Sequence, residues 1–228
     1  MIWLWIVLLL LLVIICYLIA LQYPHHLGHW YDLVIGDPHY PYYQVPPELD
    51  YLAAASSELT EHCQQIMKDF RGNYLQRYYD GPREDFYHGW EMMVLRFSYR
   101  DYWHCYPPSP SLSYLQQLCN HPALISVSIS VMAPGKHILP HRNPFPGVLR
   151  YQLPLLADDC EIIVSGVSHH YQPGVPFIFD DYLPHEVINH SSTPRWALLI
   201  DLPRPLSSST TTFINELATR ALGYLLPM

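Results

Sequence analysis

Basic residues are scarce in this chain of 228 residues. It carries 12 Lys and Arg against 20 Asp and Glu, for a formal charge of −8, and it has no Lys or Arg before Lys68. Proteins that bind nucleic acid need a basic patch to neutralise phosphates, so we exclude that class. A chain with 14% charged and 14% aromatic residues also lacks the composition of a disordered protein.

Paired cysteine motifs are absent as well. The five cysteines are scattered, and no C-x-x-C pair occurs among them: Cys16, Cys63, Cys105, Cys119 and Cys160. An odd, scattered set indicates neither a disulfide framework nor a zinc ribbon. We therefore predict free or buried thiols in a reducing compartment.

Charge is missing altogether from residues 2–21, which form an unbroken apolar run. As a helix rising about 1.5 Å per residue, this run is roughly 30 Å long and matches the hydrocarbon core of a bilayer. A cleaved signal peptide has a basic start and a small-residue cleavage site, and the run has neither. We predict a retained single-pass transmembrane anchor over residues 1–23. Its orientation is left open, because neither flank carries Lys or Arg.

Residues 24–47 are rich in Pro, His and Tyr, and they predict an irregular juxtamembrane segment lying on the membrane surface. Four histidines in this segment could bind a metal together, but interfacial polar groups are the favoured interpretation. They are His25, His26, His29 and His39.

The next part of the chain predicts helices. Apolar residues recur at helical spacing over residues 48–72, and a shorter helix is expected from Ser111 to Cys119. Residues 83–106 are aromatic and predict mixed strand and loop. In the C-terminal segment 208–228, residues 213–226 predict an amphipathic helix too short and too polar to span a membrane.

From Leu124 onward, short β-branched and aromatic runs alternate with Pro, Gly, Asp and Asn, which is typical of a β-sandwich or jelly roll. The expected strands are residues 124–132, 148–156, 160–165, 169–172, 175–179, 186–190 and 195–202. We therefore predict a mainly β fold with flanking helices. One domain is expected over residues 48–207, with its β core at about 124–205.

Three residues of this β-rich half could carry chemistry. His141 stands in ILPHRNP, His185 stands in DDYLPHEV, and Arg195 opens the following strand. Neutral imidazoles are good ligands for Fe(II), Zn or Cu. A buried arginine one strand away could hold a dicarboxylate through its planar guanidinium. By spacing alone this signal is weak in a chain with 14 histidines.

The local sequence strengthens the prediction. PGKHILPHRNPFPGVLRY (134–151) and GVPFIFDDYLPHEVINHSSTPRWALLIDLPRPL (174–206) resemble the aspartyl/asparaginyl β-hydroxylase family, and most of all its bacterial lipid A acyl-chain 2-hydroxylases. The resemblance covers about residues 85–207. It implies a double-stranded β-helix, also called a cupin-like jelly roll, that uses Fe(II), 2-oxoglutarate and O2 to hydroxylate its substrate.

The resemblance also implies roles for single residues. His141 and His185 would be metal ligands, and Arg195 would pair with the distal carboxylate of 2-oxoglutarate, with Ser130 beside it. Arg150 would contact the co-substrate on its metal-proximal side.

Two positions depart from the family pattern. Asn143 stands where many relatives have an Asp as third metal ligand, so we expect a weak amide contact or none. Gln152 stands where the family usually has His, and it brings a hydrogen-bond donor without charge. A catalytically inactive binding relative is therefore an alternative.

Other residues near the motif have both a functional and a structural interpretation. Asp180 and Asp181 could orient a metal histidine or form a polar turn. His137, four residues before His141, would share one strand face with it and could substitute as a ligand. Trp90 is expected in the core or the pocket wall. The doublet His169 and His170 is expected in a hairpin, and His190 with Ser191 in a loop.

These features predict a membrane-anchored dioxygenase that acts on a membrane-proximal substrate, with a lipid acyl chain as first choice. Hydroxylation of Asp or Asn side chains in proteins is the alternative. The catalytic half is expected in the cytosol, where reduced iron and 2-oxoglutarate are available. The oligomeric state is not predicted.

Overall fold

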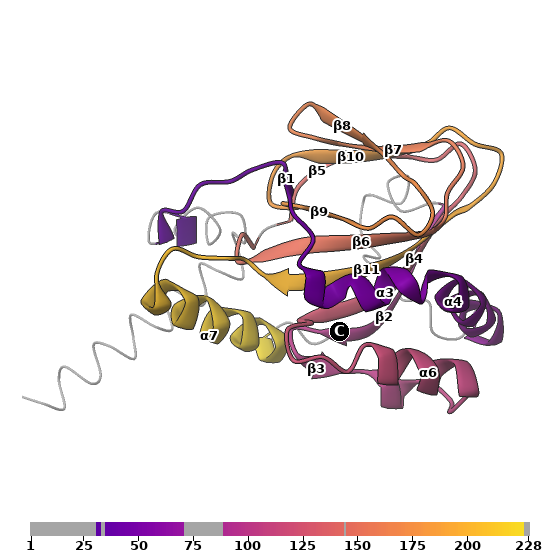
Figure 1. The fold of residues 1–228 in the computed structure, drawn as a ribbon, viewed down its shortest axis with the longest axis horizontal. Coiled ribbons are helices and arrows are strands. Elements are labelled where there is room, and N and C mark those ends of the chain that lie inside the picture. Colours follow the sequence, from indigo (N-terminus) through magenta and orange to yellow (C-terminus); the bar gives the residue numbers. More distant parts are fainter. Residues whose placement is uncertain (1–30, 33–34, 71–88, 144, 226–228) are drawn as a thin grey trace, which may run out of the picture.

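The computed structural model describes residues 31–32, 35–70, 89–143 and 145–225 (Figure 1). The predicted anchor over residues 1–23, and with it Cys16, His25, His26 and His29, lies outside the described residues. Among those that are described, no helix is long and apolar enough to cross a bilayer.

The fold is mainly β and consists of two antiparallel sheets packed face to face, as a double-stranded β-helix requires (Figure 1). The larger sheet has the strand order β1-β9-β6-β11-β4-β2-β3, and the smaller has the order β5-β10-β7-β8. The strands are β1 (Tyr42–Tyr43), β2 (Trp90–Phe97), β3 (Arg100–Asp101), β4 (Ser126–Met132), β5 (His137–His141), β6 (Val148–Leu156), β7 (Cys160–Val164), β8 (Val167–His170), β9 (Phe177–Phe179), β10 (His185–Asn189) and β11 (Arg195–Pro203).

Helices cover the outer face of the larger sheet, so that the sheet lies between them and the smaller sheet (Figure 1). They pack Leu52, Leu59, Ile66 and Leu115, all fully buried, against apolar side chains of β4, β6 and β11. The helical elements are η1 (Pro47–Leu49), α3 (Asp50–Ala54), α4 (Ser56–Phe70), η2 (Trp103–Cys105), α6 (Pro110–Leu118) and α7 (Ser209–Leu225).

The alternation along β4 explains why the site lies between the two sheets. Val127 and Ile129 belong to the core under the helices, whereas Ser126, Ser128 and Ser130 point to the opposite face. The serines are buried although they are polar, which means that the interior between the sheets is built for polar contacts.

The strand predictions are largely confirmed, with shifted ends. Strand β8 ends at His170 rather than continuing to residue 172, and β5 was not among the expected strands. The hairpin expected around His169 and His170 is formed by β7 and β8. The larger sheet also takes β1, β2 and β3 from before Leu124, so the β core begins earlier than the predicted residue 124.

The helix predictions needed two corrections. The helix expected over 48–72 is divided into η1, α3 and α4, with a break at Ala55, whose N–H still donates to the Tyr51 carbonyl at 3.1 Å. The C-terminal helix begins at Ser209 instead of residue 213. The Ser208 hydroxyl accepts from the N–H of Thr211 at 3.1 Å and so caps the helix within a Ser/Thr run that resembles a loop.

The expectation that His137 and His141 share a strand face is wrong. His185 pairs with His141 and Val187 pairs with Ile138, so β5 carries one residue more than β10 between these pairs. Such a β-bulge, at Leu139 and Pro140, reverses the alternation of side chains. His137 consequently faces solvent, where it contacts Glu186 at 2.6 Å, and is not placed as a substitute ligand.

Candidate metal and co-substrate site

His141 and His185 face each other across the β5–β10 pair, at the edge of the interior between the sheets. Their ring centroids lie 4.2 Å apart. Two imidazoles this close on adjacent strands can bind one ion together. The two predicted metal ligands are therefore brought together.

Each of these rings is held by its own backbone. Nδ1 of His141 contacts the carbonyl of Leu139, and Nδ1 of His185 contacts that of Leu183, both at 2.9 Å. A carbonyl accepts only from N–H, so the proton of each neutral ring is on Nδ1 and the metal-binding lone pair is on Nε2. Burial, reinforced by the neighbouring His141, lowers the pKa of His185 to about 3, which keeps its ring neutral.

Arg195 is buried at the start of β11, and no Asp or Glu among the described residues pairs with it. One of its terminal nitrogens donates to Ser130 Oγ at 3.2 Å, and the other lies 3.6 Å from the sulfur of Met132. Its Nε has no hydrogen-bond partner among the described residues. The ion pairs of arginine in this part of the chain belong to Arg96, Arg150, Arg204 and Arg220. Burying a cation without an anion costs roughly several kcal/mol of folding free energy, so this position favours an anionic ligand.

Trp90 connects the histidine pair to the arginine. Its ring lies 6.4 Å from that of His141, and its Nε1 donates to Ser130 Oγ at 3.0 Å. Ser130 thus accepts from Trp90 and Arg195 together, which fixes the position of all three side chains. The expectation of Trp90 in the pocket wall fits this arrangement.

Gln152 and Tyr171 form a buried pair on the other side of Arg195. The Tyr171 hydroxyl donates to Gln152 Oε1 at 2.6 Å, and the Arg195 guanidinium lies 5.5 Å from the centre of the Tyr171 ring. Because the carbonyl end of Gln152 accepts from Tyr171, its amide N–H groups are the end that can donate to a ligand. Tyr171 was not singled out from the sequence.

Asn143 and Arg150 meet at Asp181, which is fully buried. The side-chain amide nitrogen of Asn143 donates to Asp181 Oδ2, and Arg150 approaches the same oxygen at 3.1 Å. Arg150 also pairs with Asp201 at 2.9 Å. Burial raises the pKa of Asp181 despite the lowering effect of Arg150. Arg150 is thus placed between two carboxylates, whereas Asn143 keeps its carbonyl oxygen for a metal or another donor.

A small cavity of about 40 Å³ lies against the inner face of the larger sheet. It is lined by Met92, Val94, Phe97, Ser126, Ser128, Arg150, Leu199 and Asp201. This volume holds a water molecule but no organic co-substrate.

The donor set fits a divalent transition metal bound by two histidines. Within residues 31–225, apart from the gaps named above, no cluster of three or more His, Cys, Asp or Glu side chains could hold a metal. The four described cysteines, Cys63, Cys105, Cys119 and Cys160, are free thiols, as predicted.

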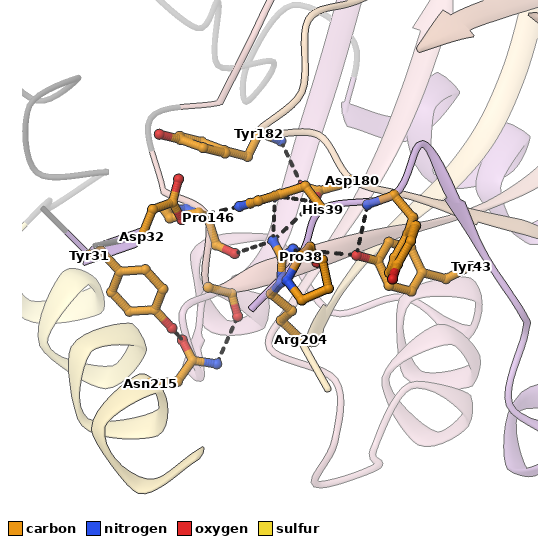
Figure 2. A network of polar contacts seen from close by, with 12 residues as sticks. Tyr31, Asp32, Pro38, His39, Tyr43, Pro146, Asp180, Tyr182, Arg204 and Asn215 are labelled. Carbon is orange, nitrogen blue, oxygen red and sulfur yellow. Dashed lines mark hydrogen bonds and ion pairs between the residues drawn. The ribbon is translucent and has the colours of Figure 1, made fainter. Parts of the chain in front are cut away.

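A second buried network connects residues 38–43 to the rest of the domain (Figure 2). Arg204, which is 4% exposed, donates to Asp180 at 3.0 Å, to the Pro146 carbonyl at 3.1 Å and to the Pro38 carbonyl at 2.8 Å. The structural alternative for Asp180 is therefore supported, because it pairs with Arg204 and does not contact His185. Residues 35–43 are bound to the domain by these contacts.

His39 is part of the same network and was predicted as an interfacial polar group. Nδ1 lies 2.6 Å from Asp180, and Nε2 lies 3.1 Å from Asp32 (Figure 2). Burial and Arg204 lower the pKa of His39, but its hydrogen bonds to the two carboxylates outweigh them and raise the pKa above 6.5. Below this pKa the ring carries a proton on each nitrogen and can donate to both carboxylates.

The stability that His39 contributes should depend on pH. A raised pKa stabilises the fold fully below 6.5, and this contribution should disappear as pH rises through the folded-state value. We expect the difference in unfolding free energy between the wild type and His39→Gln to shrink from acidic to alkaline pH. Denaturant unfolding across this range measures it, and a difference that grows with pH would contradict the assignment.

Comparisons with known proteins agree with this site. The family model described as aspartyl/asparaginyl β-hydroxylase matches residues 53–205. The chain therefore belongs to the aspartyl/asparaginyl β-hydroxylase family. The match adds residues 53–84, which include α4, to the region of about 85–207 that the resemblance covers.

Among curated proteins, an ornithine lipid ester-linked acyl 2-hydroxylase of Rhizobium tropici is 39% identical over 98 residues, or 41% of this chain and 34% of that protein. The aspartyl/asparaginyl β-hydroxylase of Homo sapiens is 32% identical over 81 residues, or 35% of this chain and 11% of that protein. The chain thus spans about a third or less of these relatives.

Solved structures similar to this chain include a sugar phosphate isomerase of the cupin superfamily from Silicibacter pomeroyi. It is 14% identical and aligns over 58% of this chain and 71% of that chain, with a TM-score of 0.38.

Proposed function

We propose that the protein is an Fe(II)- and 2-oxoglutarate-dependent hydroxylase that is anchored in a membrane and acts on a lipid acyl chain. The observation that carries the proposal is the pair His141 and His185 in one interior with Arg195, a buried cation that pairs with no anion among the described residues. A metal with a dicarboxylate co-substrate would satisfy both features.

The two histidines would hold the metal through Nε2, with Nδ1 fixed by backbone carbonyls. Bound Fe(II), together with 2-oxoglutarate and O2, supplies the oxidising power to convert a C–H bond to C–OH. The chain's own contribution is to position these groups and to exclude water, for which the buried rings of Phe177 and Phe179 beside His185 are suited.

The distal carboxylate of 2-oxoglutarate would bind Arg195, whose Nε is available, with the Ser130 hydroxyl beside it. The Gln152 amide would add a neutral donor. Arg150 is compensated by Asp181 and Asp201, so the positive charge that attracts the co-substrate would come chiefly from Arg195.

The lipid substrate is supported by the Rhizobium tropici relative and by the apolar run over residues 2–21. We propose that this run is a single transmembrane helix and that it holds the site near the bilayer, with the catalytic half in the cytosol. Reduced iron and 2-oxoglutarate are most available there.

Hydroxylation of Asp or Asn side chains in a protein is the second candidate, favoured by the human relative. Mass spectrometry of lipids from a host that expresses the chain separates the two. One added oxygen on an acyl chain supports the lipid substrate. Unmodified lipids together with hydroxylated Asp or Asn peptides would support the alternative.

The variant Arg195→Met tests the co-substrate assignment. We expect the apparent Kd for 2-oxoglutarate to rise roughly 30-fold or more, because losing a buried charged partner costs at least about 2 kcal/mol. Without 2-oxoglutarate, Arg195→Met should be as stable as the wild type or more so, because an unpaired buried charge is removed.

Calorimetric titration with 2-oxoglutarate, and thermal unfolding with and without it, measure both effects. The exposed pair Arg220 and Glu216 offers a control, since Arg220→Met should leave the Kd unchanged. A wild-type chain that binds neither Fe(II) nor 2-oxoglutarate would instead indicate a catalytically inactive relative.

A further inference from the structure

Helix α7 buries polar side chains and exposes apolar ones. Its buried side chains include the polar Asn215 and Thr219, which are 2% and 1% exposed. Phe213, Ile214 and Leu217, in contrast, are 61%, 40% and 53% exposed. A helix on the surface of a soluble domain normally shows the opposite pattern.

The polar side of α7 is fixed to the domain by specific contacts. Asn215 Nδ2 donates to the carbonyl of Gly147 at 2.8 Å, and the hydroxyl of Tyr31 donates to Asn215 Oδ1 (Figure 2). A Cβ at position 147 would collide with the Asn215 side chain, so the glycine permits this close approach. The helix cannot roll its apolar side inward without breaking these buried contacts.

The exposed apolar residues lie on one stripe. At about 100° per residue, Ile214 and Leu217 lie about 100° and 40° around the helix from Phe213. Thr212 lies on the other flank, although it is also exposed. Phe213, Ile214 and Leu217 thus form a continuous surface, here named the α7 stripe.

The position of the α7 stripe in the chain indicates what covers it. Tyr31, which contacts α7, follows the end of the apolar run at residue 21 by ten residues. Ten residues span at most about 36 Å, so Tyr31, whose side chain contacts α7, lies within that distance of the end of the proposed membrane helix. The only basic residue on α7, Arg220, is paired with Glu216. This ion pair borders the stripe on the side of Phe213 and is neutral as a pair, so the stripe offers apolar contact without net charge.

We infer that the α7 stripe lies in the lipid–water interface of the bilayer that holds the N-terminal run, so that α7 forms a second membrane contact. This inference rests on the proposed membrane location. Helix α7 is docked on Gly147, four residues after Asn143, so this contact would lie close along the chain to the candidate site.

Photo-crosslinking in the full chain tests the inference. The variant Phe213→p-benzoylphenylalanine is reconstituted in vesicles of neutral phosphatidylcholine and irradiated, and the adducts are identified by mass spectrometry. Thr212→p-benzoylphenylalanine is the matched control, because it lies one residue away on the other flank. We expect lipid adducts at position 213, in a yield that high salt does not change, and no lipid adducts at position 212.

Three outcomes would overturn the inference. They are an adduct to a second copy of the chain, an adduct to residues 1–30 of the same chain, and no adduct at position 213. Each means that the stripe is covered by protein or by water.

Failure of the proposed function is measured separately on the same vesicles. Alkaline extraction tests the N-terminal anchor, and turnover of 2-oxoglutarate tests the site. A chain that alkaline treatment extracts, but that still gives lipid adducts at position 213, would refute the proposed anchor and support the interfacial position of α7. An anchored, active chain without these adducts would refute only the inference about α7.

Discussion

Replacing His185 with alanine is expected to abolish iron-dependent turnover of 2-oxoglutarate. The variant removes one of two imidazoles whose centroids lie 4.2 Å apart, and within the described residues no further His, Cys, Asp or Glu completes a metal cluster. Loss of an outer-shell partner alone weakens metal binding by about 10- to 100-fold, so the loss of a ligand should exceed roughly 100-fold. Titration with Fe(II) under anaerobic conditions, followed by calorimetry, measures the effect.

His137→Ala is the matched control for His185→Ala. His137 lies at the other end of the strand that carries His141, but it contacts Glu186 on the solvent side. Its removal should leave the Kd for Fe(II) unchanged. Equal loss of binding in both variants would indicate damage to the sheet, and unchanged binding in His185→Ala would refute the metal site.

Replacing Arg204 with methionine is expected to destabilise the fold by roughly 3–5 kcal/mol, because it takes a buried guanidinium away from a buried carboxylate that then keeps His39 as its remaining ion-pair partner among the described residues. Asp180 is fully buried and pairs with Arg204 at 3.0 Å, and the same guanidinium holds the carbonyls of Pro38 and Pro146. Residues 35–43 should detach from the domain at the same time. Urea unfolding of the detergent-solubilised chain, followed by tryptophan fluorescence, gives the change in free energy.

Arg220→Met again supplies the comparison. Its ion pair with Glu216 is half exposed, and its guanidinium lies over the Tyr99 ring at 4.3 Å, so the change should cost about 1 kcal/mol or less. Similar losses in the two variants would mean that the network around Arg204 contributes no more than a surface pair.

The β fold could be predicted because strand alternation is a local signal. In SVSISVM, serines alternate with Val and Ile, and the structure turns the two sets to opposite faces of β4. The ends of elements were less predictable, because they depend on contacts outside the segment. The start of α7 is one example, since Ser208 acts as a cap only once the following residues are helical.

The site was predictable where the family motif marks it. His141 and His185 face each other and Arg195 contacts Ser130, whereas the roles that the resemblance implies for these residues stay predictions. Tyr171 carries no motif, and its role follows only from its place under Arg195 and beside Gln152. A sequence signal for such a residue would require knowing which strands are neighbours.

Long-range ion pairs were also missed. The sequence that carries the resemblance contains acidic residues and Arg204, but it does not show which of them pair. In the structure Asp180 pairs with Arg204, and Arg150 pairs with both Asp181 and Asp201. Likewise, His39 pairs with Asp180 at a separation of 141 residues. Composition alone cannot pair opposite charges that far apart in the chain.

The bulge in β5 makes the length of that strand a chemical requirement. Since the extra residue between Ile138 and His141 restores the inward direction of His141, deleting Leu139 or Pro140 would exchange the inner and outer positions of the imidazole. Point substitutions there keep the geometry, whereas insertions or deletions of one residue destroy it. During evolution residues 138–141 should therefore tolerate substitutions far better than insertions or deletions.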